Sequence, residues 1–243
     1  MSERFLRNEM LLGAEAMEKL SGSSVAVFGL GGVGSWCAEA LCRSGVGKIT
    51  LIDQDTVGES NINRQLCALS STIGKLKAEV MAERLRDINP EVEAIPLASR
   101  YDADSREIFF QARYDYIVDC IDLVACKLDL IETAVRRGIP IISALGTGNK
   151  RNAEMLKITD ISKSEGCPFA RVVRKELRRR GIEHLPVVYS KEPAMKPEDV
   201  EEPPPGRRSI PGSLVWVPAT AGMLLCSHVV TQILDFKNKE DGK

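Results

Sequence analysis

The sequence lacks cysteine pairs of the Cys-x-x-Cys type, which excludes a structural zinc site built from two such pairs. The cysteines that are present are typical of small buried residues in a reduced cytosolic protein. They are scattered and odd in number, and lie at Cys37, Cys42, Cys67, Cys120, Cys126, Cys167 and Cys226. Cys167 precedes Pro168 at the expected start of a helix, where a reactive thiol is an alternative to a capping or packing role.

The start of the chain lacks an apolar signal region, so we expect a cytoplasmic protein rather than a secreted one. A stretch without Asp, Glu, Lys or Arg does occur over residues 212–234, and it reaches the ~20 residues needed to cross a bilayer. We predict no membrane span, because polar residues and a proline interrupt the stretch. A buried helix, reached by a strand that carries Trp216, explains it better, with His228 as a hydrogen-bonded core residue.

Helical and strand patterns alternate along most of the chain. A helix is expected over residues 8–20, followed by strands and helices that alternate to about residue 143, and by a later strand over residues 155–161. This order predicts an α/β fold, namely a Rossmann-like, doubly wound, mainly parallel sheet with flanking helices and a C-terminal crossover loop and helix. At 243 residues we expect a single domain, in which residues 162–212 form a basic helix and a mobile crossover region.

Glycines follow the first predicted strand in the pattern Gly-x-Gly-x-x-Gly. The apolar run from Val25 leads into Gly29, Gly31, Gly32 and Gly34, so a buried strand turns into a helix whose first N–H groups point at a phosphate. Asp53 closes a second apolar strand about 20 residues later, where a carboxylate accepts ribose hydroxyls. To this point, the pattern equally fits a dehydrogenase that binds NAD.

Two cations after the second strand favour a triphosphate. Arg64 lies just past that strand and Lys77 lies on the next helix, so the pair can hold the β- and γ-phosphates while the glycine turn holds the α-phosphate. Taken singly, Arg64 is better explained by a surface salt bridge and Lys77 by a solvated helix face. Their combination after the glycine turn favours the phosphate role.

A third acidic position follows the strand that starts at Tyr116. Asp122 would lie at the same sheet edge as Asp53, where it can hold Mg²⁺ against phosphate oxygens. Asp119 is expected only to cap the end of the strand. Lys127, one turn into the next helix, either contacts a phosphate or faces solvent, and we include it in the candidate nucleotide site.

A second informative segment is a basic helix. The sequence over residues 169–180 places Ala170, Val173 and Leu177 on one face, and the cations Arg171, Arg174, Lys175 and Arg178 along another. The whole chain is nearly neutral, with 33 basic and 34 acidic residues, so the basic face is a local feature. It indicates either a polyanion, such as nucleic acid, as partner or an ordinary solvated helix.

Together, these motifs resemble those of the adenylating enzymes related to ubiquitin-activating enzyme and to the activators of bacterial sulfur-carrier proteins. The matching pieces are Arg4-Phe-Leu-Arg7, the glycine turn, Asp53-Gln-Asp55, Ser60-Asn61-Ile-Asn63-Arg64-Gln65, Lys77 and Asp119-Cys-Ile-Asp122. The resemblance implies ATP and Mg²⁺ as cofactors. Ribose is then bound at Asp53, with Asp55 beside it, the triphosphate by Ser60, Asn61, Asn63, Arg64 and Lys77, and the metal by Asp122.

Two further residues bear on this resemblance. Arg7 resembles the arginine that reaches into the partner subunit's site, which implies a homodimer with Arg7, Arg64, Lys77 and Asp122 as catalytic residues. Leu123 stands where the family often has Asn after the magnesium aspartate, so one polar contact differs here.

The absence of cysteines at certain positions distinguishes between the branches of this family. Zinc pairs are absent, and no cysteine lies in the crossover region over residues 183–211 to form a thioester. Further matches are Ile158-Thr-Asp-Ile161, Tyr189-Ser-Lys-Glu192 and Cys226-Ser-His228, and with the basic helix they resemble the branch that dehydrates threonylcarbamoyladenosine in tRNA. The resemblance implies that ATP activates the threonyl carboxylate and that the neighbouring carbamoyl group then closes a ring. Adenylation of the C-terminus of a ubiquitin-like sulfur carrier, a nicotinamide redox enzyme and a sulfur-transfer protein partner stay open as alternatives.

Overall fold

A seven-stranded sheet forms the centre of the protein, in a computed structural model that describes residues 3–196, 198 and 211–235. The strand order is β3-β2-β1-β4-β5-β7-β6, and every neighbouring pair is parallel except β7 with β6. The strands are β1 (Ser24–Phe28), β2 (Lys48–Ile52), β3 (Glu93–Leu97), β4 (Tyr116–Asp119), β5 (Ile141–Ala144), β6 (Leu156–Asp160) and β7 (Pro186–Ser190). This is the predicted doubly wound sheet, with an antiparallel strand at one edge.

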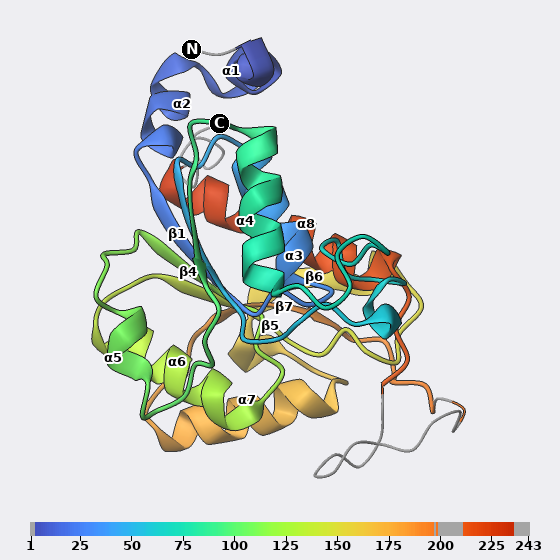
Figure 1. The fold of residues 1–243 in the computed structure, drawn as a ribbon. Helices are drawn as coiled ribbons and strands as arrows, with labels where there is room; N and C mark the ends of the chain where they lie inside the picture. Colours follow the sequence, from blue (N-terminus) through green and yellow to red (C-terminus); the bar gives the residue numbers. More distant parts are fainter. Residues whose placement is uncertain (1–2, 197, 199–210, 236–243) are drawn as a thin grey trace.

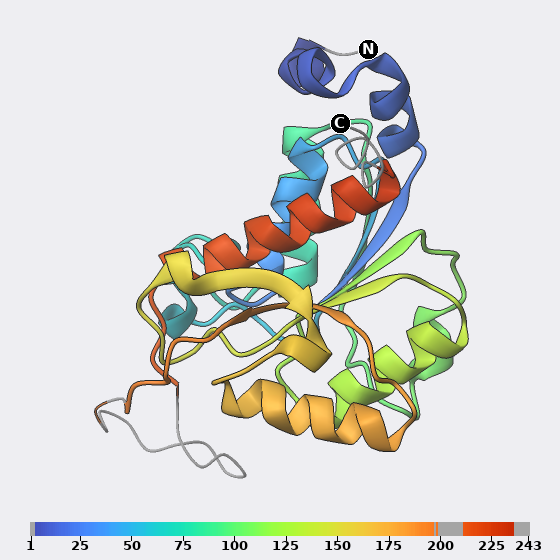
Figure 2. The ribbon, with the colours of Figure 1, turned by 180° about the vertical axis from the view of Figure 1, so that it is seen from behind.

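Helices cover both faces of the sheet (Figures 1 and 2). One face packs against α2 (Ala14–Ser21), α3 (Gly34–Arg43), α4 (Lys77–Ile88) and α8 (Trp216–Ile233). The other packs against α5 (Arg106–Phe109), α6 (Val124–Arg136) and α7 (Pro168–Arg179). Short 3-10 turns occur at Glu3–Phe5, Glu59–Asn61, Ala153–Met155 and Ile161–Lys163. Central strands are buried on both faces, which explains their continuous apolar runs.

The order in which the chain adds strands to the sheet reverses next to β1. From β1 the chain passes outward to β2 and β3, and then returns to β4 on the other side of β1. The ends of β1, β2 and β4 therefore meet at one edge, where open α/β sheets bind ligands.

The structure corrects the first predicted helix. The segment over residues 8–20 is divided into α1 (Leu6–Leu12) and α2, because Gly13 adopts φ +85° and ends the first helix. Both helices lie at the end of the molecule where the strands begin (Figure 1).

Two further predictions are wrong near the C-terminus. The crossover region predicted after the basic helix and up to residue 212 includes the strand β7, whose run of β-branched and aromatic residues pairs with β5 and β6. Residues 197 and 199–210 lie outside the described part of the chain. Trp216 begins α8 rather than lying on a strand.

The charge-free segment over residues 212–234 forms the buried helix that the sequence predicts. Gly222 allows α8 to approach α3 closely, because a Cβ there would lie 2.6 Å from the carbonyl oxygen of Val33. His228 accepts or donates a hydrogen bond at 3.1 Å to the hydroxyl of Tyr116. None of the helices in the described ranges has the length and apolar character needed to cross a membrane.

Candidate nucleotide site at the ends of β1, β2 and β4

The glycine turn joins β1 to α3 at the point where the strand order reverses. Gly29 has φ +88°, and a Cβ there would lie 2.8 Å from the carbonyl oxygen of Cys120 on the neighbouring β4 turn. A Cβ on Gly34 would lie 1.8 Å from the carbonyl oxygen of Gly29, so both positions require glycine. By contrast, the nearest atom to a Cβ on Gly31 would be Nε2 of Gln65 at 3.9 Å, which leaves this part of the turn open to a ligand.

Asp53 directly follows β2 and faces this turn. Its Oδ2 accepts a hydrogen bond from the Leu30 N–H at 2.7 Å, and its Oδ1 accepts one from the Asp55 N–H at 2.8 Å. Burial raises the pKa of the Asp53 carboxyl, and the two backbone hydrogen bonds oppose that shift. Asp53 therefore lies where a ribose-binding carboxylate is expected, and its oxygens orient the glycine turn.

Lys77 is the first residue of α4, and its side chain is 6% exposed. Its Nζ lies 3.1 Å from Oδ2 of Asp55, whose side chain is 58% exposed, and its N–H donates to the Asp55 carbonyl at 2.9 Å. Among the described residues Asp55 is the only hydrogen-bond partner of the ammonium, which leaves two of its three donors for a ligand. Lys77 is thus held in place by an exposed carboxylate and does not lie on a solvated helix face.

The segment over residues 58–65 forms a compact turn beside Gly32. The Arg64 guanidinium donates to the Ser60 carbonyl and to Oδ1 of Asn63, both at 2.8 Å. Asn61 accepts a hydrogen bond from the Gly58 N–H at 3.1 Å. These bonds hold the Arg64 side chain against its own turn. Among the described residues Arg64 has no ion-pair partner, so the surface salt bridge considered from the sequence does not form with any of them.

The residues after β4 correct the expectation for Lys127. Its side chain is fully buried, and the ammonium donates to Oδ2 of Asp119 at 2.5 Å, to Oγ of Ser143 at 2.9 Å and to the carbonyl of Ala144 at 3.0 Å. All three donors are used, so Lys127 neither faces solvent nor has an N–H left for a phosphate. We therefore remove Lys127 from the nucleotide site.

Asp119 does more than cap β4. Besides Lys127 and Ser143, it accepts the Ile121 N–H at 3.0 Å and so fixes the turn that leads to Asp122. The Asp122 carboxylate is exposed at the same sheet edge, while the Asp119 carboxylate is fully buried. Ser143 completes this cluster, and no sequence motif distinguished it.

Asn149 ends the sequence Gly146-Thr-Gly-Asn149, which is expected to form a turn near the site. It adopts φ +60°, and its backbone N–H donates to the Gly212 carbonyl at 2.8 Å. Its carbonyl accepts the Met195 N–H at 2.8 Å, and its Oδ1 accepts the Gly212 N–H at 2.7 Å. Asn149 therefore holds both flanks of the segment between Met195 and Gly212 next to the site.

Arg7 lies away from the nucleotide site of its own chain. The neighbouring Asn8 donates to the Arg43 carbonyl and Arg4 to the Ile88 carbonyl, which places this segment at the C-terminal ends of α3 and α4. These helix ends lie opposite the glycine turn (Figure 1). Arg7 is therefore not part of the nucleotide site of its own chain.

The basic helix is α7, and Ala170, Val173 and Leu177 are buried as predicted. Arg171, Lys175 and Arg178 are exposed, and none of them forms an ion pair with a described residue. Arg174 differs, because its guanidinium donates to the carbonyl of Ser164 and, at 2.7 Å, to its Oγ. Arg174 therefore supports local structure, and the exposed basic face consists of the other three cations.

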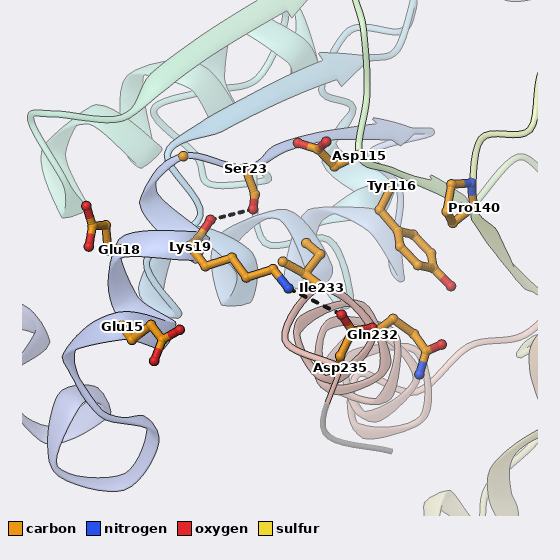
Figure 3. A pocket seen from close by; sticks show the side chains of 11 residues that line it. Glu15, Glu18, Lys19, Ser23, Asp115, Tyr116, Pro140, Gln232, Ile233 and Asp235 are labelled. Carbon is orange, nitrogen blue, oxygen red and sulfur yellow. Dashed lines mark hydrogen bonds and ion pairs between the residues drawn. The ribbon is translucent and has the colours of Figure 1, made fainter. Parts of the chain in front are cut away.

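Two hollows lie at the opposite, amino-terminal edge of the sheet, with volumes of about 790 and 570 Å³. The larger one runs between α2, the start of β4 and the end of α8, and carboxylates are prominent in its lining (Figure 3). Lys19 crosses it to reach Asp235 at 3.4 Å. Neither hollow contains a residue of the candidate nucleotide site.

A glycine turn at the switch point of a doubly wound sheet, with an acidic residue after β2 and fixed cations beside it, defines a nucleotide-binding α/β protein. The chain belongs to the ThiF family, whose model matches residues 5–241.

The chain is also similar to individual members of this family. The chain is 42% identical to the tRNA threonylcarbamoyladenosine dehydratase of Bacillus subtilis, over 96% of both chains. It superposes with a TM-score of 0.87 and 33% identity on the crystal structure of the Escherichia coli tRNA N6-threonylcarbamoyladenosine dehydratase, TcdA, in complex with ATP, covering 98% of this chain and 96% of that one. A more distant relative is the adenylyltransferase and sulfurtransferase UBA4 of Vanderwaltozyma polyspora, 35% identical over 63% of this chain and 34% of that protein.

Proposed function

We propose that this protein is an ATP-dependent dehydratase that cyclises threonylcarbamoyladenosine in tRNA through an acyl-adenylate. The observation that carries the proposal is the pair of fixed cations, Lys77 and Arg64, beside a glycine turn that is open to a phosphate at Gly31. The similarity to the dehydratases of B. subtilis and E. coli supports it. We treat residues 1–243 as one adenylating domain, acting in the cytoplasm where tRNA and ATP are found.

The reaction takes place in two steps. A threonyl carboxylate oxygen attacks the α-phosphorus of ATP, and pyrophosphate leaves. An atom of the neighbouring carbamoyl group then attacks the activated acyl carbon, losing a proton as AMP leaves with the former carboxylate oxygen. The nucleoside thereby loses one water. Because nucleophile and electrophile belong to one substrate, proximity accelerates the second step.

Each residue of the site has a role in this reaction. Asp53, with Asp55 beside it, binds the ribose, and the glycine turn donates to the α-phosphate at Gly31, Gly32 and Gly34. The Gly29 N–H is already donated to the Ile52 carbonyl at 2.8 Å, so Gly29 serves the shape of the turn. Arg64 and Lys77 hold the β- and γ-phosphates and stabilise the departing pyrophosphate. Ser60, Asn61 and Asn63 shape the Arg64 turn.

The residues present fit Mg²⁺. Asp122 presents a carboxylate at the site, and no group of three or more His, Cys, Asp or Glu ligands gathers anywhere in the described residues. One or two carboxylates that share the ion with phosphates suit Mg²⁺ better than an all-protein cage. When bound, Mg²⁺ neutralises charge on the phosphate oxygens. The contribution of this chain is to hold Asp122 in place through the Asp119–Ile121 hydrogen bond.

The environment of the cysteines supports a mechanism without a protein nucleophile. Cys120 is the nearest cysteine to Asp122 in sequence, and burial raises its thiol pKa well above the ordinary value. Burial likewise raises the pKa of Cys67 to about 11. Cys167 is buried and packs in the core under α7, consistent with the packing role considered from the sequence.

We propose that tRNA lies along α7. The first turn of this helix lies against the loop that follows β5, since a Cβ on Gly146 would meet the Cβ of Phe169 at 3.5 Å. The exposed cations Arg171, Lys175 and Arg178 continue from that contact along the helix, and they offer phosphate contacts to an RNA that enters the site.

We further propose a homodimer in which Arg7 completes the site of the partner. In its own chain Arg7 lies at the opposite end of the molecule, and α1 exposes Leu6, Met10 and Leu11. If a second copy packed against this apolar surface, Arg7 of the first chain would lie at the interface and could contact the site of the second chain.

The test is nucleoside mass spectrometry of threonylcarbamoylated tRNA after incubation with the protein, with and without ATP and Mg²⁺. We expect loss of one water only when ATP is present. The similarity to UBA4 favours adenylation of a ubiquitin-like carrier as the second candidate. An unchanged nucleoside in a folded preparation that binds ATP would favour that carrier. Cofactor absorbance without pyrophosphate release would favour the redox enzyme.

A further inference from the structure

Trp216 is the only exposed residue among the phenylalanines, tyrosines and tryptophans in the described part of the chain. It is 50% exposed, whereas each described phenylalanine and tyrosine, like Trp36, is buried or half-buried. Aromatic side chains dominate binding energetics because they offer a large flat surface at a low cost in conformational entropy.

Hydrogen bonding fixes the orientation of this indole. Its Nε1 donates to the carbonyl of Arg151 at 2.7 Å, so the polar atom is satisfied while the ring stays accessible. A ring held in one orientation before a ligand arrives does not have to be ordered on binding.

Trp216 also lies on a segment that contacts the nucleotide site on both sides. Three residues before it, the Ser213 carbonyl accepts a hydrogen bond from the Asn63 side chain at 3.0 Å. Two residues after it, Pro218 lies against the glycine turn, because a Cβ on Gly32 would be 3.2 Å from the Pro218 Cβ. Trp216 and Pro218 both lie in the first turn of α8, so the turn that carries the indole is also the turn that contacts the nucleotide site.

The surroundings favour RNA over an apolar protein segment. Arg151 is exposed and its carbonyl accepts the indole N–H, and the Arg64 side chain lies beside Gly32, which Pro218 also contacts. Phosphodiester groups complement these cations, and a base beside them complements an aromatic ring. Proteins recognise single-stranded RNA loops by stacking unpaired bases on such rings.

We propose that Trp216 is the stacking platform for the adenine ring that carries the threonylcarbamoyl group. This inference rests on the proposed function. Stacking of the base at the rim of the site would leave the threonyl carboxylate directed towards the glycine turn, where the α-phosphate is held. The indole would then select an unpaired purine and set its distance from ATP.

Three substitutions test the platform. Trp216→Leu keeps an apolar side chain without a ring, Trp216→Ala removes most of it, and Trp216→Phe keeps a ring without the Arg151 hydrogen bond. We expect Leu and Ala to raise KM for modified tRNA about 5- to 150-fold, the range measured for loss of one stacked base, and Phe to raise it far less. ATP affinity, measured by calorimetry, should not change. Ile108→Ala is the matched control, because Ile108 is 58% exposed on α5.

Tryptophan fluorescence provides an independent measurement. Stacking should quench part of the emission when an anticodon stem-loop RNA is added to the wild-type chain, and Trp216→Phe should abolish that part. An unaltered KM in Trp216→Leu, with a wild-type enzyme that turns over, would overturn the platform. If the wild-type chain fails to dehydrate tRNA, the proposed function fails, yet the quench still decides whether the indole stacks on RNA. Quenching by a ubiquitin-like carrier instead of RNA would contradict both.

Discussion

Two lysine–aspartate pairs stand at the same edge of the sheet, and they differ in what they leave for a ligand. Lys77, after β2, has one described partner, the largely exposed Asp55. Lys127, after β4, is fully buried and bonded to Asp119, Ser143 and the Ala144 carbonyl. Both are lysines near the start of a helix, and each pairs with an aspartate at the end of a strand or just after it. The number of donors already used therefore separates a phosphate-binding lysine from a structural one.

The strongest way to break this comparison is to remove the buried ammonium. Lys127→Met leaves the Asp119 carboxylate buried without its ion-pair partner, and we expect a loss of about 3–5 kcal/mol in the free energy of unfolding. Urea unfolding measures it. The double variant Lys127→Met/Asp119→Asn removes both charges and should recover much of the loss. A single variant as stable as wild type would show that Lys127 is not a structural lysine.

The complementary variant, Lys77→Ala, should affect catalysis and not folding. Loss of a cation that stabilises the departing pyrophosphate should lower kcat by about 10²–10³-fold. AMP formation measures this effect, and urea unfolding provides the stability check. Lys75→Ala is the control, since Lys75 is exposed two residues away. If Lys77→Ala turned over at the full rate, Lys77 would lose its assigned role.

Asp122→Ala should abolish AMP formation, and full turnover by this variant would contradict the magnesium role of Asp122.

The cations of α7 show the same difference between side chains that are free to bind a ligand and side chains that bond within the protein. Changing Arg171, Lys175 and Arg178 to Gln should weaken tRNA binding most at low salt and reduce the salt slope by about 2–3, because up to three phosphate contacts are lost. Arg174→Gln should leave the slope near its wild-type value and reduce stability, because Arg174 bonds to Ser164. Filter binding across salt concentrations checks both. If all variants had the same salt slope as the wild type, α7 would be an ordinary solvated helix that does not bind tRNA.

The smallest expected effect concerns the pH response of the site. Burial raises the pKa of Asp53 above that of an ordinary aspartate. Its contribution to stability is therefore fully present below the unfolded-state pKa and is lost as the pH rises through the folded-state pKa. ATP affinity should show the opposite trend, weakening as the pH falls through the raised pKa, because a protonated carboxyl accepts ribose hydroxyls poorly. Calorimetry across pH should lose this trend in Asp53→Asn.

Local patterns predicted the central part of the fold and the site. The runs that became β1, β2 and β4, the glycine turn and the buried face of α7 depend on neighbouring residues in sequence, and the structure confirms them. The division of the first helix has a local cause, because Gly13 lies inside the predicted range and adopts a positive φ. Other failures have non-local causes: β7 pairs with β5 and β6, which lie on either side of it. Likewise, the three partners of Lys127 are 8 to 17 residues away, and no spacing rule links them.

The central claim is that the oxygen lost by the nucleoside leaves in AMP. The direct test uses tRNA whose threonyl carboxylate is labelled with ¹⁸O, followed by mass spectrometry of the nucleotide products. The account predicts AMP that contains one ¹⁸O atom, together with unlabelled pyrophosphate. Label in inorganic phosphate, with ADP as the other product, would mean that an acyl phosphate forms and would contradict the adenylation mechanism.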